Sequence, residues 1–487
     1  MNPAWTIIAS FVGALLTLVL PLRMESLARW VALAAATTGL VASVLLALCH
    51  LDNPGQPAWT LDVPWIPELG IRFHLAAPGL SLVLMVLTGI VAVGGVLYSW
   101  NVHHRTGTFF TLFLTIIGGV YGVFLSRDAF LLFVFYEVVI LPKYFLIAVW
   151  GGHNKAYGAM KLTIYSIASS AMVLLGLGAA YAVSGTGSFD LATLAAAKYP
   201  LAFQLWAFPL LCIGFGVLAG LWPFHTWAPT GHTAAPTAAS MLLAGVVMKL
   251  GAYGILMVAI PLFPDGFAYW RTAMAVLAVI GIVHGAFTAL TRKDLKFIIA
   301  YSSVSHMGFI LLGLATATAW GYQGAVLQMI SHGIIAGLLF GIAGRIVYDR
   351  VHVRDLTALA EHDLWNRLPG AVVAFALASA ASMGMPGFSG FVAELMVLIG
   401  VWSAFPKLIP VLVVAIVVTG IFSLRALNRA FLPKTTVTTD DLDPLPAITR
   451  AEIAATVLLL ATSLAIGLYP KPWLDLIADG LTLPLLP

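Results

Sequence analysis

Charged residues are scarce in this sequence. Asp, Glu, Lys and Arg together make up 9% of its 487 residues, whereas hydrophobic residues make up 61% and the mean hydropathy is +0.99. This composition excludes an ordinary soluble protein of several domains and indicates a polytopic membrane protein. The net charge of +4 is small for the length and is spread over short loops, which argues against nucleic-acid binding.

Cysteine and the common catalytic motifs are also scarce or missing. The two cysteines, Cys49 and Cys212, lie far apart in apolar segments. This excludes a disulfide framework, a CxxC pair and an iron–sulfur cluster, so we expect no redox chemistry and no metal in this chain. The sequence has no P-loop, no HExxH motif and no nucleophile elbow, which argues against an independent enzyme.

Long hydrophobic runs, in contrast, occur along the whole chain. Runs of roughly twenty apolar residues, the length that crosses a bilayer core, predict about fourteen transmembrane helices. They lie near 4–21, 28–49, 77–99, 107–125, 129–149, 157–184, 203–222, 234–262, 272–290, 295–315, 322–343, 371–396, 408–427 and 453–470. The first run lacks a small-residue cleavage site, so we expect a retained helix rather than a signal peptide.

The basic residues between these helices test the count. If the loops alternate between the two sides of the membrane, one side receives Arg23, Arg29, Arg105, Lys155, Arg292, Lys293, Lys296, Arg345, Arg350, Arg354, Arg367, Arg429, Lys434 and Arg450. The other side receives only Arg72, Arg127, Lys198, Arg271, Lys407 and Lys471. Cytoplasmic loops carry the excess of Lys and Arg. The asymmetry therefore favours fourteen helices and predicts a bacterial inner membrane protein with both termini on the non-cytoplasmic face.

Proline and glycine interrupt two of the predicted helices. The segment "FHTWAPTGHTAAPT", with Pro223, Pro229 and Pro236, ends the seventh helix, and "SMGMPGFSGFVAEL", around Pro386, lies in the twelfth. Proline removes a backbone donor, and broken helices at membrane depth are tolerated where they are buried in protein or line a hydrated cavity. Such a pair indicates internal repeats and a transport site, although ordinary proline kinks are the alternative.

A few ionisable side chains lie inside the predicted helices, where a charge is costly and by default functional. They are Glu137, Lys143, Lys161, His225, His232, Lys249, His306, His332 and Glu394. Lysine and histidine in hydrated cavities can exchange protons. The set therefore predicts a proton relay, with structural polar pairs as the alternative. We expect the break in the seventh helix to bring water and His225 into the membrane interior.

Several long segments resemble the signature segments of the antiporter-like subunits of respiratory complex I, most closely the subunit M family. They are "KYFLIAVWGG", "FHTWAPTGHTAAPT", "LLAGVVMKLGAYG", "KDLKFIIAYSSVSHMGFILLG", "QMISHGIIAGLLF" and "MPGFSGFVAELMVLIG", in this order between about Ser126 and Gly400. Subunits L and N, Mrp sodium/proton antiporter subunits and hydrogenase membrane arms are related. Subunit M also resembles this chain in carrying a glutamate, here Glu394, where L and N carry lysine. The long lateral helix of subunit L has no counterpart here.

The resemblance implies an all-α fold with two inverted five-helix repeats, each containing a broken helix. It divides the chain into helices 1–3 at 1–106, a first repeat at 107–262, a second repeat at 263–430, and a C-terminal loop with helix 14 at 431–487. It implies a proton relay of Glu137, Lys249, His306, His332 and Glu394, with His225 and His232 in the broken-helix region. Such subunits have no cofactor and move protons or sodium ions beside neighbouring membrane subunits, driven by redox events in partner subunits.

One position departs from the family pattern. The family pairs its fifth-helix glutamate with a seventh-helix lysine, seven residues before the histidine of "FHTW", and that position is Leu218 here. Glu137 therefore lacks its expected partner. Lys143 follows Glu137 by six residues, about 120° away on an ideal helix, so it replaces the lysine only if Pro142 bends the chain. The alternative is that Lys143 extends towards the cytoplasmic end of its helix.

The sequence therefore predicts a proton-translocating membrane-arm subunit of a complex I-like NADH:quinone oxidoreductase. Two alternatives stay open. A membrane subunit of a related cation/proton antiporter, hydrogenase or uptake complex is favoured by the missing lysine at Leu218. A structural spacer that does not conduct is disfavoured by the retained Lys249 and Glu394.

Overall fold

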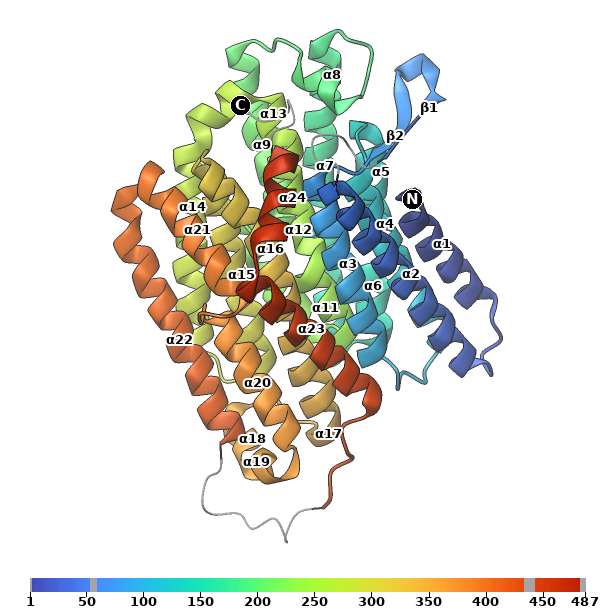
Figure 1. The fold of residues 1–487 in the computed structure, drawn as a ribbon, viewed down its shortest axis with the longest axis vertical. Coiled ribbons are helices and arrows are strands. Elements are labelled where there is room, and N and C mark those ends of the chain that lie inside the picture. Colours follow the sequence, from blue (N-terminus) through green and yellow to red (C-terminus); the bar gives the residue numbers. More distant parts are fainter. Residues whose placement is uncertain (1, 53–58, 433–442, 482–487) are drawn as a thin grey trace.

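Long helices that run side by side make up nearly all of the computed structural model, which describes residues 2–52, 59–432 and 443–481 (Figure 1). The N-terminal part consists of α1 (Ala4–Val19), α2 (Glu25–Asp52), β1 (Thr60–Ile66), η1 (Pro67–Leu69), β2 (Ile71–Ala76) and α3 (Gly79–Tyr98). The next part consists of α4 (Thr106–Leu125), α5 (Ala129–Val138), α6 (Ile140–Trp150), α7 (Lys155–Ser184), α8 (Leu191–Ala195), α9 (Leu201–Ala219), η2 (Phe224–Thr226), α10 (Trp227–Ala234), α11 (Thr237–Leu242), η3 (Leu243–Val247), α12 (Met248–Gly254), η4 (Ile255–Ala259) and α13 (Ile260–Leu262).

The second half of the chain continues the helical bundle. It consists of α14 (Pro264–Thr291), α15 (Leu295–Ala315), α16 (Ala319–Phe340), η5 (Gly341–Tyr348), α17 (Asp349–Val351), α18 (Leu356–Leu359), η6 (Ala360–His362), α19 (Leu364–Arg367), α20 (Pro369–Ser382), α21 (Ser389–Ala404), η7 (Pro406–Leu408), α22 (Ile409–Phe431), α23 (Arg450–Leu468) and α24 (Lys471–Leu481).

The described residues contain 12 helical segments that are long and apolar enough to cross a membrane. Three shorter apolar helices, α1, α20 and α21, lie beside them. The predicted all-α membrane class is therefore confirmed. The count of about fourteen helices and the two inverted repeats stay predictions.

One short hairpin was not expected from the sequence. Strands β1 and β2 pair antiparallel, from Thr60 opposite Ala76 to Ile66 opposite Ile71, with an irregularity between Pro64 and Ile66. Gly70 closes the turn with φ of +65°, a left-handed conformation that favours glycine. In Figure 1 the hairpin lies at the upper end of the molecule, and buried side chains of β2 fasten it there, with Leu75 in the hydrophobic core.

Both predicted helix interruptions are present. α9 ends at Ala219 with Gly220 in the left-handed conformation, and a separate helix, α10, begins at Trp227. The Trp227 indole donates a hydrogen bond to the Val217 carbonyl at 2.7 Å, which fastens the two halves together. α20 ends at Ser382 and α21 begins at Ser389. In both places the interruption frees backbone groups and positions side chains inside the bundle.

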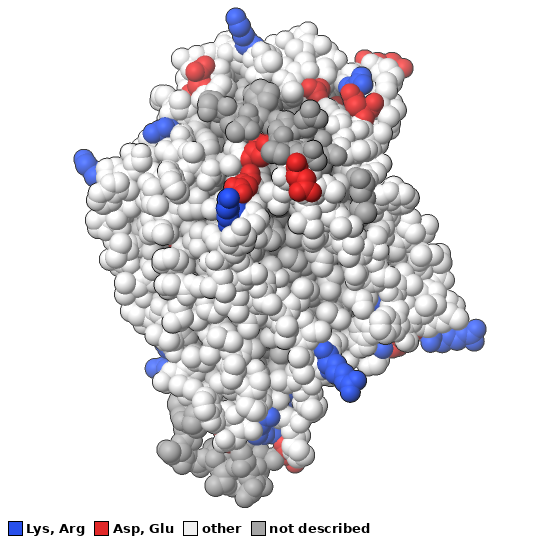
Figure 2. Space-filling view, in the orientation of Figure 1, with Lys and Arg blue, Asp and Glu red and all other residues white. Residues whose placement is uncertain are grey.

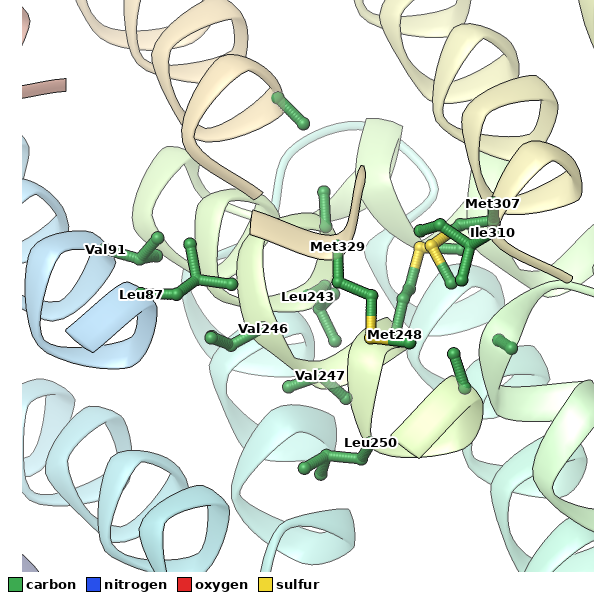
Figure 3. Close-up of a cluster of buried hydrophobic side chains, with 14 of the residues drawn as sticks. Leu87, Val91, Leu243, Val246, Val247, Met248, Leu250, Met307, Ile310 and Met329 are labelled. Carbon is green, nitrogen blue, oxygen red and sulfur yellow. The ribbon is translucent and has the colours of Figure 1, made fainter. Parts of the chain in front are cut away.

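The predicted eighth helix, near 234–262, lies at the centre of the molecule. It runs from α11 to α13, and two π-helical segments, η3 and η4, flank α12. Apolar side chains surround it, among them Leu87 and Val91 of α3, Met307 of α15 and Met329 of α16 (Figure 3). π-Helical segments inside α-helices frequently occur at functional sites. The centre of the bundle is thus apolar, apart from the side chains described below.

Charged side chains lie mainly towards the two ends of the molecule, and the middle of the face shown in Figure 2 has few of them. The loops that the sequence assigned to the Lys- and Arg-rich side lie together. Arg354, for example, pairs with Asp294 and donates to the carbonyl of Thr233. We call this end the basic face. The separation of loop charges is what a bundle that spans a bilayer requires.

Candidate functional site

Lys249 of α12 lies at the centre of the predicted relay and is fully buried. Its Nζ atom donates to the carbonyl oxygen of Ala244 in η3 and lies 2.8 Å from Nδ1 of His332 on α16. A charged lysine has only donors, so His332 accepts at Nδ1 when Lys249 is protonated. The two side chains therefore form a direct donor–acceptor pair, across which a proton can be transferred.

His306 of α15 connects this pair with Glu394. We call the four side chains Lys249, His332, His306 and Glu394 the central line, or the Lys249 line. The ring centroids of His306 and His332 are 5.5 Å apart, and Nδ1 of His306 lies 3.4 Å from Oε1 of Glu394. The same nitrogen lies 3.2 Å from Nε2 of Gln328. An amide nitrogen only donates a hydrogen bond, and a carboxylate only accepts one. An unprotonated Nδ1 therefore accepts from Gln328, whereas a protonated Nδ1 donates to Glu394. His306 is thus positioned to switch partners with its protonation state.

A small cavity joins these groups. Its volume is about 10 Å³, enough for about one water molecule, and its lining includes His306, His332, Gln328 and Glu394. Among the described residues, Nε2 of His332 and Oε1 of Gln328 are buried without a hydrogen-bond partner. The cavity therefore connects Nε2 of His332 with the carboxylate of Glu394.

The break between α20 and α21 shapes the acidic end of the line. Gly384 has φ of +72°, and a Cβ atom at this position would lie 2.6 Å from Oε2 of Glu394. Ser382, the last residue of α20, lies 3.3 Å from Nε2 of His306. The glycine is therefore required both by the backbone conformation and by the space that Glu394 occupies.

The two histidines of the seventh-helix region lie in different surroundings. His232 of α10 is fully buried and stacks on Phe340, with ring centroids 5.1 Å apart. It lies within electrostatic range of Lys249 and Lys296. His225 instead lies against His284 of α14, with ring centroids 4.9 Å apart. His232 therefore belongs with the central line, and His225 belongs to a separate cluster.

The first-half residues do not form the expected pair. The helix is interrupted at Val139, between α5 and α6, and Lys143 is 1% exposed, so it does not extend to solvent. Lys143 interacts electrostatically with Glu137, but no ion pair within 4.0 Å joins these two described residues. Oε1 of Glu137 has no hydrogen-bond partner in the described chain. Leu218, at the position of the missing lysine, is buried in α9.

A larger cavity opens at the basic face. Its volume is about 230 Å³, and its lining includes Lys296, Arg345, Arg354, Trp150 and Thr237. Lys296 is nearly buried, and its Nζ atom donates to the carbonyl of Ala235 at 3.2 Å. His232 lies within the electrostatic range of both Lys296 and Lys249, so it relates this cavity to the buried Lys249.

Sequence reasoning missed two residues of this arrangement. Gln328 precedes His332 by four residues on α16, a spacing that places both side chains on one helix face, and this was the available signal. Lys296 was counted only as a loop charge. No group of three or more His, Cys, Asp or Glu side chains that could hold a metal occurs within residues 2–52, 59–432 and 443–481.

Comparisons with known proteins agree on one kind of relative. The family model described as "NADH:quinone oxidoreductase/Mrp antiporter, TM" matches residues 126–422. NADH-quinone oxidoreductase subunit M of Pseudomonas aeruginosa is 36% identical, over 98% of this chain and 96% of the relative. The subunit M of Escherichia coli K12 is 37% identical, over 97% of this chain and 95% of the relative.

Solved structures with the same fold come from large membrane complexes. A chain of respiratory complex I from Thermus thermophilus with bound NADH is similar with a TM-score of 0.89 and 25% identity, over 98% of each chain. A chain of the Mrp complex from Dietzia sp. has a TM-score of 0.84 and 23% identity, over 98% of this chain and 96% of that chain. The second similarity concerns the fold alone.

Proposed function

Because the chain belongs to the antiporter-like membrane subunits of the NADH:quinone oxidoreductase and Mrp antiporter family, we propose that it is a proton-translocating membrane-arm subunit of a complex I-like NADH:quinone oxidoreductase. The observation that carries this proposal is the 2.8 Å contact between Lys249 and His332, which continues through His306 to Glu394. Four ionisable side chains from four helices form one line through an apolar bundle. A purely structural polar pair would need only two of them.

In this proposal the proton moves along the line by changes of protonation state. A protonated Lys249 donates its proton to Nδ1 of His332 and becomes neutral. His332 then releases a proton from Nε2 towards the cavity that it lines together with His306 and Glu394. His306 takes up the proton, turns from Gln328 to Glu394, and delivers it to the carboxylate. Each transfer leaves the donor neutral. His332 then holds the former Lys249 proton on Nδ1, and it accepts from Lys249 again once its remaining proton is back on Nε2.

Protons reach Lys249 from the basic face. The 230 Å³ cavity brings solvent to Lys296, and the fully buried His232 lies within electrostatic range of both Lys296 and Lys249. We assign this face to the cytoplasm because it carries the excess of Lys and Arg, with both termini on the opposite side of a bacterial inner membrane. The partners are neighbouring membrane subunits, whose redox events drive the transfer. The chain itself carries no cofactor.

The first half of the molecule works differently from the family pattern. Glu137 and Lys143 interact over more than 4.0 Å, and Leu218 occupies the position of the usual lysine. In our proposal Lys143 is the substitute cation for Glu137. Its burial and its electrostatic interaction with Glu137 support this role.

The decisive experiment compares the native host complex with a Lys249→Ala variant in liposomes. We expect Lys249→Ala to abolish proton pumping while quinone reduction stays measurable, since His332 then has no lysine donor. Lys407→Ala serves as the matched control, because Lys407 is an exposed lysine at the opposite end from the basic face, and it should pump like the native complex. If Lys249→Ala also pumps normally, the relay is wrong and the chain is a spacer.

A Leu218→Lys variant tests the altered first half in the same liposomes. If the missing lysine limits transport, its restoration opposite Glu137 should increase the number of protons moved per electron. An unchanged stoichiometry, together with a loss on Lys143→Leu, would show that Lys143 already fills this role.

A related cation/proton antiporter or uptake complex is the second candidate, and Leu218 is the observation that favours it. Transport by the liposomes in the presence and absence of sodium separates the two. Coupled sodium movement that does not need NADH oxidation would favour this second candidate.

A further inference from the structure

A second set of polar side chains lies outside the central line, where α7 and α14 meet η2 and the start of α10. We call it the lateral seam and define it as Lys161, Tyr165, Thr226, Thr230, His225 and His284. Nζ of Lys161 lies 3.3 Å from Oγ1 of Thr230, and the Tyr165 hydroxyl lies 3.0 Å from Oγ1 of Thr226. Lys161 and Tyr165 are four residues apart, as are Thr226 and Thr230, so the two helices meet with matched helical spacing.

Two histidines form the inner end of the seam. His225 lies in η2, directly after the break in the seventh helix, and His284 lies on α14, with ring planes 70° apart. His225 is 3% exposed, and no side chain of the described residues bonds to its ring nitrogens. The one backbone group in the described chain that acts on the ring is the carbonyl of Pro223, so at least one of the two ring nitrogens stays without a partner. A buried polar group without a partner costs roughly 1–3 kcal/mol, so a packing role does not explain this histidine.

The position of His284 gives the pair a connection to the surface. His284 is half-buried. It lies eight residues before Arg292, the residue that follows α14 at the basic face, which is about 12 Å along a helix axis. Lys161, Tyr165, Thr226 and Thr230 are also half-buried. The seam is therefore a polar strip that leads from the side and the basic end of the bundle to the buried His225.

The charged and titratable groups around the pair decide what it can bind. His225 faces His284 and Lys161, and His284 faces Arg292, whose guanidinium also lies 5.2 Å from the ring centroid of Tyr301. No carboxylate is among the groups acting on either histidine in the described chain. A divalent metal would lack a third ligand and would be repelled by these cations. A single proton, carried by one imidazole at a time, fits this environment better.

We propose that His225 and His284 form a second proton-exchange site, fed along the lateral seam and separate from the Lys249 line. The step is a proton transfer from a ring nitrogen of His284 to an unprotonated nitrogen of His225, after a rotation of one imidazole has brought the two nitrogens within hydrogen-bond distance. His225 then releases its other ring proton to the broken-helix region, and His284 takes up a new proton from the seam. This inference rests on the proposed function, because the site supplies protons to the same transport, for which the Lys249 line stays necessary. His284 is a transferring group in it, and Lys161 is a positioning residue.

The test measures proton pumping by the host complex in liposomes over a range of pH. The variants are His284→Ala and His284→Gln, and His153→Gln is the matched control, because His153 is an exposed loop histidine outside both sets. We expect His284→Ala to slow pumping on the order of a hundredfold, as loss of an acid–base group typically does, and added imidazole to restore part of the rate. The His153→Gln variant should behave like the native complex.

Each outcome separates this inference from the proposed function. Normal pumping by both His284 variants, with pumping abolished by Lys249→Ala, overturns the lateral path and leaves the proposed function standing. A slow His284→Ala variant that imidazole does not rescue, with an unchanged pH profile, assigns His284 to structure and also overturns the inference. Normal pumping by Lys249→Ala overturns the proposed function itself.

Discussion

At the residue scale, the balance between two partners at one nitrogen of His306 is the central feature. Gln328 and Glu394 both approach Nδ1, at 3.2 Å and 3.4 Å, and their chemistry prevents both from bonding to it at once. The position of Glu394 therefore decides how easily the histidine turns to it. That position depends in turn on Gly384, which leaves room for the carboxylate.

A Gly384→Ala variant should slow proton transfer between His306 and Glu394. The alanine would carry strain of roughly 1–2 kcal/mol in the left-handed conformation, and its Cβ would push Oε2 of Glu394 from its place, 2.6 Å away. Gly387→Ala is the matched control, because Gly387 has φ of +99° but open space around it. Pumping per quinone reduced in liposomes is the measurement. Equal losses in both variants would mean that strain alone, and not the clash with Glu394, is responsible.

At the element scale, ion pairs and helix caps fasten the ends of the helices. Glu452 accepts the backbone N–H of Thr449 in a capping box at the start of α23 and also pairs with Arg345 and Arg350, at 2.8 Å and 2.7 Å. At the other end of the molecule, Asp190 caps α8 and pairs with His74 of β2 at 2.9 Å. The two carboxylates thus hold segments that are far apart in the sequence.

Glu452→Gln should destabilise the docking of α23. The carboxylate is 1% exposed, and its replacement leaves two arginines facing a neutral amide, at a cost of about 3 kcal/mol. Glu25→Gln is the control, since Glu25 forms a more exposed pair with Arg29 that contributes less than about 1 kcal/mol. Thermal unfolding of the purified complex in detergent measures both. A Tm for Glu452→Gln as high as that for Glu25→Gln would contradict the prediction.

Asp190→Asn should change how stability depends on acidity. Burial raises the pKa of Asp190, but hydrogen bonds from His74 and Thr193 outweigh it and lower the pKa from 3.8 to about 2. A lowered folded-state pKa stabilises the protein above pH 3.8, and the contribution is lost as the pH falls towards 2. The native protein should therefore lose more stability than Asp190→Asn over this window. Hydrogen exchange in β2 and α8 as a function of pH measures the difference, and parallel curves would refute it.

At the scale of the whole molecule, the distribution of charge defines two ends and a middle that has few charges (Figure 2). In Figure 1, the start of α1 and the end of α24 lie towards the same end as the hairpin, opposite α18 and α19. The cavity lined by Lys296, Arg345 and Arg354 opens at the basic face, so the orientation of the protein decides from which compartment protons arrive.

Single-cysteine labelling should establish this orientation. In a background without Cys49 and Cys212, Lys198→Cys should react with an impermeant maleimide added to intact cells. His153→Cys should react only after permeabilisation, because its loop lies at the basic face next to Ala234. Both side chains are exposed, so burial does not explain a difference. The reverse labelling pattern would place the 230 Å³ cavity on the outer side and invert the direction of transport.

The sequence by itself determined the membrane class, the approximate places of the helices and the two interruptions. These features depend on local properties, namely runs of apolar residues and the backbone effects of proline and glycine, which act within one segment. The segments that resemble the family also identified Lys249, His332, His306 and Glu394 as one set. The sequence did not predict the hairpin, because both strands are short, β1 is mostly exposed, and β1 contains a proline.

The tertiary structure alone decided which ionisable groups meet. Lys249 and His332 are 83 residues apart in the sequence, so their contact depends on how α12 packs against α16. The same packing brings Gln328 to His306, places His232 near Lys249, and puts His225 against His284 instead. Helical periodicity fixes which face a side chain lies on, but the neighbour of that face follows from the packing of the whole bundle, which no local pattern contains.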